Sequence, residues 1–382
     1  MRVLTLTNIG RPIAATCGAV PAPDRSRNSW IEFNVAAHGL RGVASILVLA
    51  AHIIGGTARH IYPQDSGYVR LVEHPWYFGT FGVEIFFVIS GFVILPSVMK
   101  YSLREFALRR IARICPLFYV LSVLFVGLNL ATNAYSNLNE PGTVAAGLLF
   151  VNLFTGTEQL TPNAWSLSYE MCFYALVALV VNFAIKTRNV PAGAVAITAA
   201  LAFVIFFPIA IYFLIGMLMR LIVRTDDVAT RASRVVELSS LAMLVWFASR
   251  AHFDYSTWQQ FSDPVVPPIL LSISTYFYLA LRHGSVTAQL LDNPAFRYIG
   301  NVSYSLYLVH PFPYFGLRML FVHYGLFTDD IAKSMIIFSI AVFTTSFLLA
   351  HIAHLLLERW PYQKLFHQKV YRENSRIAGA TS

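Results

Sequence analysis

Residues 39–56, GLRGVASILVLAAHIIGG, decide the fold class of this chain. At about 1.5 Å per residue, a helix over this apolar run nearly crosses a bilayer hydrocarbon core of about 30 Å. The run contains Arg41 and His52, and ionisable side chains inside a span indicate function by default. Because they are eleven residues apart, they share one helix face at about 16 Å separation along the axis. The stretch therefore predicts a membrane helix with two polar groups at different depths, too far apart to hydrogen-bond to each other.

Similar runs recur along the 382 residues, of which 57% are hydrophobic and 12% charged. These fractions are not those of an ordinary soluble domain. We expect an all-α, polytopic transmembrane helical bundle with about ten spans, near 33–55, 76–98, 114–132, 166–185, 191–207, 208–223, 236–250, 267–281, 300–323 and 331–357. Two places leave the count open. Residues 143–154 are short enough to be re-entrant or interfacial, and Pro208 allows a different division of its run.

The positive charges predict the orientation of these helices. If the N-terminus is cytoplasmic, 22 of the 28 Lys and Arg residues fall in inner segments and four in outer ones. This asymmetry is typical of a bacterial inner-membrane protein with both termini in the cytoplasm. We expect residues 1–30 to be a flexible cytosolic tail, 31–360 the integral membrane domain and 361–382 a basic cytosolic tail. The net charge of +9 favours membrane lipid headgroups or a phosphorylated cytosolic ligand over nucleic acid, and no RNA- or DNA-binding pattern is present.

Several catalytic and metal-binding patterns are missing from the sequence. Cys17, Cys115 and Cys172 share no metal-ligand spacing, so we expect neither a structural disulfide nor a zinc site. The Walker A, G-x-S-x-G, H-E-x-x-H and C-x-x-C patterns are also missing. These absences argue against an ATPase, a serine hydrolase, a zinc protease or a thiol oxidoreductase. We expect no metal in the reaction.

Six segments in a fixed order resemble a known family. They are LRGVASILVLAAH (40–52), FGVEIFFVISGFVI (81–94), LRRIARICPLFY (108–119), AWSLSYEMCFYAL (164–176), NVSYSLYLVHPF (301–312) and LERWPYQ (357–363). Together, over roughly residues 33–365, they resemble the membrane acyltransferase family three, which O-acylates surface polysaccharides, Nod factors and macrolides. The resemblance implies a ten-helix membrane enzyme. Such an enzyme takes acetyl or another short acyl group from cytosolic acyl-CoA and delivers it to a hydroxyl of a carbohydrate-type acceptor.

The resemblance suggests roles for three ionisable residues. Arg41 and His52 match the family's signature of Arg, ten residues and His. We expect His52, near the outer end of its span, to be the general base, because imidazole titrates near neutrality; its position alone also fits a histidine that meets lipid headgroups. Arg41 would hold a pyrophosphate, a thioester carbonyl or a carboxylate, or form a structural ion pair. Glu170, downstream of the Trp-Ser-Leu motif at 165–167, is expected at the depth of His52, where it would orient the imidazole, or else serve as an acid at a helix N-terminus.

A basic cluster precedes the third span. Arg110 and Arg113 are neighbours on a helix, and two guanidinium groups at that spacing can bind phosphate oxygens bidentately. They match the family's Arg-x-x-Arg, which implies an acyl-CoA site with Arg109 beside it. The alternative is anchoring against lipid phosphates, which this segment provides in any case.

Further polar residues lie in the second and ninth spans. Glu84 stands where the family more often has Asp, and we expect a structural role, with Arg41 as the nearest intramembrane partner in sequence. In the ninth span, Tyr304, Tyr307 and His310 could line a pantetheine tunnel or hydrogen-bond a thioester, with Tyr304 as a cofactor contact. They could equally be polar contacts between helices. Glu358 resembles a structural residue of a cytosolic helix terminus.

One alternative function stays open. Intramembrane Arg, His and Glu residues also build proton-coupled pathways, so a secondary transporter or a flippase of a sugar-containing substrate is the rival. Transporters usually contain repeated halves with matching broken helices, and the sequence has none. For the enzyme, the expected depths place CoA phosphates on the cytosolic side and His52 near the other side. We favour threading of the thioester along a tunnel over relay of an acyl intermediate.

Overall fold

The first half of the chain is helical from its first described residues. The computed structural model describes residues 33–63, 66–224 and 227–366. In chain order the first elements are α1 (Val35–Ala51), the π-helical turn η2 (His52–Gly56), α2 (Thr57–Ile61), α3 (Gly67–Thr80), α4 (Gly82–Lys100), α5 (Leu103–Thr132), η3 (Ser136–Asn139), α6 (Pro141–Leu148), α7 (Asn152–Thr155), α8 (Ala164–Val180) and η4 (Val181–Lys186).

The second half continues in the same way. Its elements are α9 (Val190–Phe206), η5 (Pro208–Ala210), α10 (Ile211–Ile222), α11 (Arg231–Ala248), η6 (Trp258–Ser262), α12 (Val266–Ala280), α13 (Val286–Leu291), α14 (Pro294–Val309), α15 (Pro311–His323), α16 (Ile331–Ala353), η7 (His354–Arg359) and α17 (Trp360–Phe366). The described residues contain no β-strand, only a single bridge between Val228 and His283. The all-α prediction is confirmed.

Short polar side chains mark where the helices begin. The Asn34 side chain accepts a hydrogen bond from the backbone N–H of Ala37 at 2.9 Å and so caps α1. Asn293 caps α14 in the same way through Phe296, and Pro294 follows at the first helical position, where its missing N–H has no cost. These caps mark where α1 and α14 begin, two of the four helices that contribute to the candidate site.

Each of the ten expected spans coincides with a helix or a continuous helical pair. By length and apolar composition, five helical segments can cross a membrane: Val35–Ile61, Gly67–Lys100, Leu103–Thr132, Ala164–Lys186 and Ile331–Phe366. The count becomes six if α9 and α10, which bend by 113° at the break before Pro208, form one span. The chain is therefore an all-helical membrane protein, while the total of ten spans stays a prediction. Residues 143–154 form α6 and α7, which are too short to cross.

Most residues of the two predicted tails lie outside the part of the chain that the structure describes. The tail predicted over residues 1–30 lies outside the described residues. Of the tail predicted over 361–382, residues 361–366 are described, and they belong to α17.

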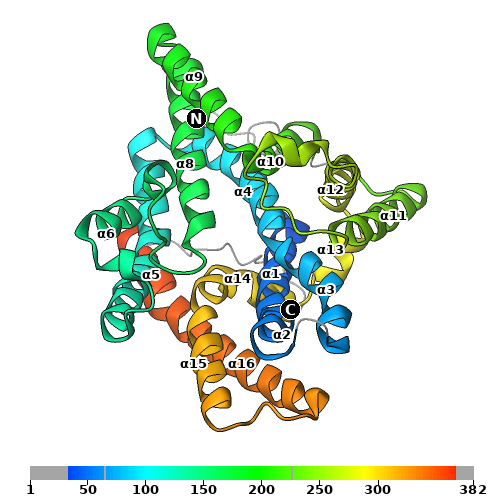
Figure 1. The fold of residues 1–382 in the computed structure, drawn as a ribbon. Coiled ribbons are helices and arrows are strands. Elements are labelled where there is room, and N and C mark those ends of the chain that lie inside the picture. The colour runs from blue at the N-terminus through cyan, green and yellow to red at the C-terminus, as the bar shows by residue number, and fades with distance from the viewer. Residues whose placement is uncertain (1–32, 64–65, 225–226, 367–382) are drawn as a thin grey trace, which may run out of the picture. The chain divides into compact units, whose positions relative to one another are not determined.

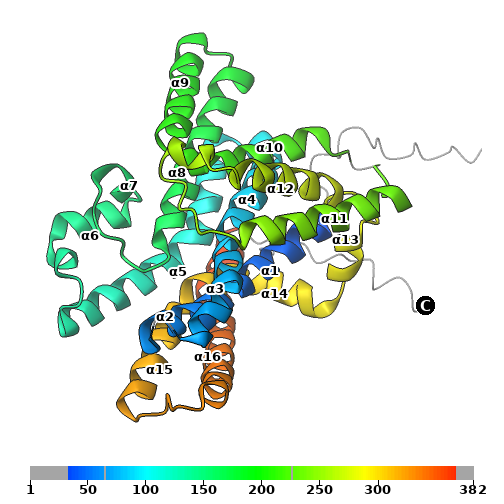
Figure 2. The same cartoon turned by 45° about the vertical axis from the view of Figure 1, so that its right-hand side comes forward.

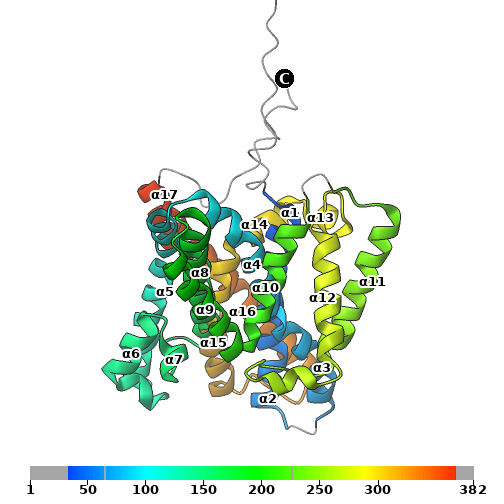
Figure 3. The same ribbon diagram turned by 90° about the horizontal axis from the view of Figure 1, so that it is seen from above.

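Figure 3 shows α13 and α17 near one end of the long helices, and α2 and α6 near the other. The charge pattern predicts the same grouping; which end is cytoplasmic remains a prediction.

Helices α1, α4 and α14 lie together and form the framework of the site (Figure 1). α1 packs on both α4 and α14, while α4 also packs on α10. α11, α12 and α13 gather beside α10 (Figure 2). The contact between α1 and α14 is close because both helices place glycine there. A Cβ atom added to Gly300 would lie 2.6 Å from the His38 carbonyl oxygen, and one added to Gly42 would lie 2.9 Å from the Gly300 nitrogen. Small residues are the usual means by which membrane helices approach closely.

Candidate functional site

A pocket between four helices collects polar side chains that are distant in sequence. The space between its lining atoms, part of which is open to solvent, is about 440 Å³. Helix α1 contributes Arg41, α4 contributes Ser90, α8 contributes Ser166 and Glu170, and α14 contributes Tyr304 and Tyr307; the apolar wall consists of Val83, Phe86, Phe87, Leu167 and Leu308. An apolar pocket with a few convergent polar groups is the usual form of a small-molecule site.

Glu170 anchors one part of this pocket. Its Oε1 atom accepts a hydrogen bond from Ser90 Oγ at 2.5 Å and another from the Tyr174 hydroxyl. The guanidinium carbon of Arg110 lies 4.8 Å from the centre of the Tyr174 ring. The Arg-x-x-Arg segment of α5 is therefore brought to the Glu170 cluster. Sequence reasoning overlooked Ser90 and Tyr174; Tyr174 follows Glu170 by four residues, the spacing of neighbours on a helix.

Arg113 lies beside a buried carboxylate. Its Nε atom is 3.8 Å from Glu358 Oε1, and Glu358 is fully buried. The other oxygen, Oε2, accepts hydrogen bonds from His354 Nδ1 at 2.9 Å and from Ser305 Oγ at 3.1 Å. Glu358 thus joins η7 to α5 and α14 inside the protein. The interpretation of Glu358 as part of a cytosolic helix terminus is wrong, although a structural role fits these contacts.

Arg109 has different neighbours from Arg110. Its guanidinium donates to Glu105 Oε1 at 2.8 and 2.9 Å and to the Tyr362 hydroxyl at 3.2 Å. It also lies over the rings of Tyr101 and Phe366. Consecutive residues on a helix point about 100° apart, so Arg109 and Arg110 have different partners. The structure separates Arg109 from the predicted phosphate-binding pair.

Tyr304 ties α14 to α5 as well as lining the pocket. Its hydroxyl donates to the backbone carbonyl of Ile114 at 2.7 Å. Tyr307 lies one helical turn further along α14, and its hydroxyl is 2.8 Å from Ser166 Oγ. The two tyrosines therefore place polar groups at successive levels of the same pocket.

His52 is the first residue of the π-helical turn η2 and is half-buried. Single π-helical turns within α-helices occur frequently at functional sites. The His52 Nδ1 atom is 2.8 Å from the Val48 carbonyl oxygen. Because a carbonyl can only accept, Nδ1 carries a hydrogen. In the neutral imidazole, Nε2 is therefore the nitrogen with the free lone pair, and it is the atom that can accept a proton.

Two aromatic rings border His52. The ring of His310 lies at a centroid distance of 5.1 Å and that of Tyr314 at 6.0 Å, both edge to face. His310 is fully buried at the junction of α14 and α15. Asn163, directly before α8, reaches this junction: its Nδ2 atom is 2.8 Å from the Tyr307 carbonyl oxygen and 3.4 Å from His310 Nε2. Asn163 was not singled out from sequence, where it stands two residues before the Trp-Ser-Leu motif.

Comparison with known proteins identifies the family. The model of the family-three acyltransferase domain matches residues 34–354. The chain belongs to this acyltransferase family. Acyltransferase MdmB of Streptomyces mycarofaciens is 32% identical over 145 residues, covering 36% of this chain and 36% of the relative. An uncharacterized protein of Haemophilus influenzae is 31% identical over 122 residues, covering 27% of this chain and 50% of the relative. No solved structure matches the chain.

The structure differs from the sequence-based prediction in the partner of His52. Glu170 was expected to touch the imidazole, but it bonds to Ser90 and Tyr174, while His52 Nδ1 bonds to Val48. The physical reason is depth. α8 begins level with His310, which Asn163 contacts, and Glu170 follows Asn163 by seven residues, or about 10 Å along the helix. The prediction that Glu170 orients His52, as the carboxylate of a catalytic triad does, therefore does not hold in the structure.

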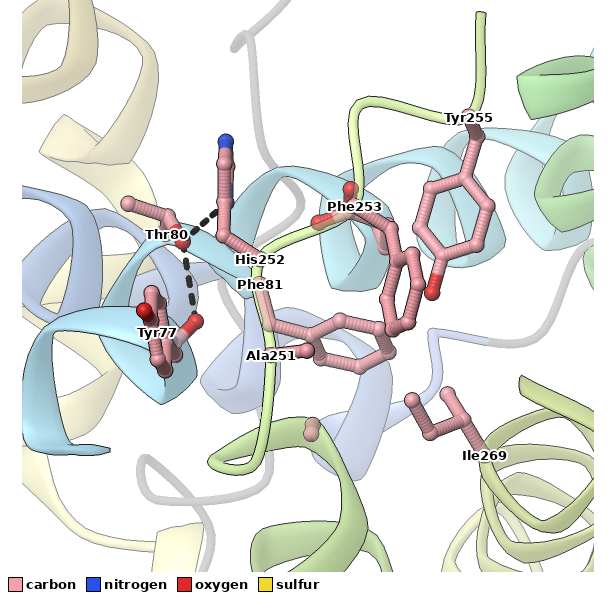
Figure 4. Close-up of a pocket in the computed structure, with 10 residues that line it drawn as sticks. Tyr77, Thr80, Phe81, Ala251, His252, Phe253, Tyr255 and Ile269 are labelled. Atoms are coloured by element: carbon pink, nitrogen blue, oxygen red, sulfur yellow. Dashed lines mark hydrogen bonds between the residues drawn. The ribbon is translucent and has the colours of Figure 1, made fainter. Parts of the chain in front are cut away.

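The structure also places Glu84 away from Arg41. No ion pair joins these two residues in the part of the chain that the structure describes. Glu84 is buried, and its Oε2 atom has no hydrogen-bond partner among the described residues. It lines a second pocket of about 220 Å³ with Thr80, His252 and Tyr255 (Figure 4). The neighbouring side chains of α4 explain this, because Val83, Phe86 and Phe87 face the pocket of Arg41 instead.

Proposed function

We propose that this protein is an integral membrane O-acyltransferase that moves acetyl or another short acyl group from acyl-CoA to a hydroxyl of a carbohydrate-type acceptor. Family membership supports acyl transfer. The observation that carries the assignment of the site is the bond from His52 Nδ1 to the Val48 carbonyl, which makes Nε2 the proton-accepting nitrogen of the neutral ring. A base in this form is what an attacking hydroxyl needs at neutral pH.

The donor would bind from the side of the arginines. Arg110 beside Tyr174, and Arg41 in the wall of the pocket, supply positive charge at the level of Glu170. Guanidinium groups bind phosphate oxygens strongly through paired N–H donors. Arg113 also carries positive charge at this level, which the nearby carboxylate of Glu358 partly neutralises. In this proposal, acyl-CoA leaves its phosphates at Arg110 and extends its pantetheine arm past Tyr304 toward Tyr307.

The chemical step would take place between Tyr307 and His52. As the acceptor oxygen attacks the thioester carbonyl, its proton moves to His52 Nε2. The hydroxyl groups of Tyr307 and Ser166 line the pocket there and would donate hydrogen bonds to the oxyanion. The C–S bond then breaks, the new ester remains on the acceptor, and the proton passes from His52 to the thiolate of CoA. Threading of the donor through the pocket removes the need for a relayed acyl intermediate.

Labelled acetyl-CoA supplied to proteoliposomes tests the function. Thiol release that depends on an acceptor supports the enzyme; movement of the acceptor without consumption of acetyl-CoA supports the transporter or flippase. The acceptor itself can be an exopolysaccharide, an O-antigen, a lipo-oligosaccharide or a glycoside. Mass spectrometry of surface glycans from cells with and without the gene distinguishes among these classes.

Two substitutions test the roles of the residues. His52→Ala should lower kcat by about 10²- to 10⁴-fold, because it removes the general base. Arg110→Ala should raise the KM for acetyl-CoA by about tenfold or more, as expected for one lost charge-assisted hydrogen bond. Arg104→Ala is the matched control, because this arginine lies on the same helix but is exposed. Full activity in His52→Ala together with a normal donor KM in Arg110→Ala would overturn the assignment.

A further inference from the structure

The junction between α14 and α15 leaves the backbone carbonyl of Tyr307 without its usual donor. In an α-helix the carbonyl of Tyr307 would accept from the N–H of residue 311. Residue 311 is proline, which has no N–H. The side chain of Asn163 takes its place, with Nδ2 at 2.8 Å from that oxygen. The break in the helix thus creates a docking point for the start of α8.

This bond decides how the Asn163 amide is turned. The Tyr307 carbonyl can only accept, so the atom facing it must be the amide nitrogen rather than the oxygen. The same nitrogen is 3.4 Å from His310 Nε2. The buried side chain, 4% exposed, therefore presents a donor to His310.

His310 is held in one protonation state by its two neighbours. Nδ1 is 3.0 Å from the Leu306 carbonyl oxygen and must donate to it. Nε2 faces the donor group of Asn163 and must accept. A proton on Nε2 would set two donors against each other in a fully buried place. The hydrogen bonds thus favour a neutral His310.

We propose that Asn163 and His310 are positioning residues for His52: Asn163 keeps His310 neutral, and the neutral ring stabilises the positive charge that His52 acquires during acyl transfer. The rings lie 5.1 Å apart, edge to face. No carboxylate hydrogen-bonds to His52 among the described residues. A neutral aromatic ring can stabilise a nearby cation, whereas a second cation at that distance would slow the step by about 100-fold.

This inference rests on the proposed function and adds no proton transfer to the proposed reaction. The proton still moves from the acceptor hydroxyl to His52 Nε2 and then to the CoA thiolate, while His310 keeps its single Nδ1 hydrogen throughout. The titratable and charged groups around His310 come from several elements: His52 from η2, Tyr307 from α14, and Tyr314 from α15, with Arg318 one turn beyond it. None of them is a carboxylate that would favour a charged His310.

Asn163→Asp tests the proposal in the full-length protein. The carboxylate would accept from His310 and so favour its protonated form. The expected result is a fall of about tenfold in kcat at pH 7, smaller than for an isolated cation because the new carboxylate offsets part of the charge of His310, with the KM values for acetyl-CoA and acceptor within about twofold. The activity should recover at higher pH, where His310 loses the proton. Asn129→Asp is the matched control, because Asn129 is also buried and also donates to a backbone carbonyl, that of Tyr135.

The double variant Asn163→Asp with His310→Gln separates charge from packing. Glutamine cannot be protonated, so the double variant should be as active at pH 7 as His310→Gln alone. The recovery of activity at higher pH that is expected of Asn163→Asp should be absent from the double variant. The proposal is overturned if Asn163→Asp keeps normal kcat, or if it is slow at every pH and His310→Gln gives no rescue. These outcomes differ from failure of the proposed function, which would appear as full activity of His52→Ala.

Discussion

Replacing Gly300 by alanine should loosen the contact between α1 and α14. The added Cβ would lie 2.6 Å from the His38 carbonyl oxygen, and ordinary contacts begin at 3.4 Å. The two helices must therefore separate by about 0.8 Å, because a backbone atom cannot rotate away. Overpacking of this kind costs about 1–3 kcal/mol, and we expect about 2–3 kcal/mol here. The midpoint of thermal unfolding in detergent should fall by about 3–4 °C for a chain of 382 residues.

The same shift should reduce activity, because α1 leads directly into His52 and α14 into His310. A misplacement of about 1 Å can cost about 100-fold in rate. Both measurements are made beside Gly316→Ala in α15, where an added Cβ meets nothing within 4 Å. This control should be neutral or stabilised by up to about 1 kcal/mol. The reasoning is refuted if Gly300→Ala melts with the wild-type protein, or if both variants lose the same stability.

Two further substitutions test charged and titratable groups. Glu358→Ala should destabilise the protein by about 3–5 kcal/mol, because Arg113 loses a fully buried carboxylate partner; an unchanged melting midpoint in detergent would contradict this. His252 lies in the segment after α11, and burial lowers the pKa of its imidazole. The unfolded chain therefore binds this proton more readily below pH about 6.5, so stability should fall as the pH falls from about 7 to 5. His252→Gln should flatten that slope in melts across the pH range, and superimposable profiles would count against it.

Sequence patterns predicted the positions of the helices well. Each of the ten expected apolar runs coincides with helical structure, since in a bilayer every backbone N–H and C=O must be satisfied within the segment. They were less informative about which helices cross the membrane, because several are too short or too polar to meet the length and composition of a span by themselves. Helices α9 and α10 bend by 113° next to Pro208, the proline at which the sequence allowed a different division of the apolar run.

Motif spacing predicted part of the site. Arg41, Glu170 and Tyr304 line one pocket, as expected for residues of one functional centre. The spacing of Arg110 and Arg113 on one helix face holds as well, although Arg113 also pairs with Glu358, whose burial was not predicted. Local periodicity places residues on a face of their own helix and says nothing of the partner opposite.

The all-helical class, the apolar lengths of the helices and the eleven-residue separation of Arg41 and His52 can be read from the sequence, because helix rise and apolar length are local properties. Which side chains meet follows only from how the helices pack. The depth at which α8 begins takes Glu170 away from His52, and the rotation of α4 turns Glu84 away from Arg41. The break at Pro311 brings Asn163 to His310. Such contacts depend on the axial shift and rotation of one helix against another, which close packing sets and local spacing cannot encode.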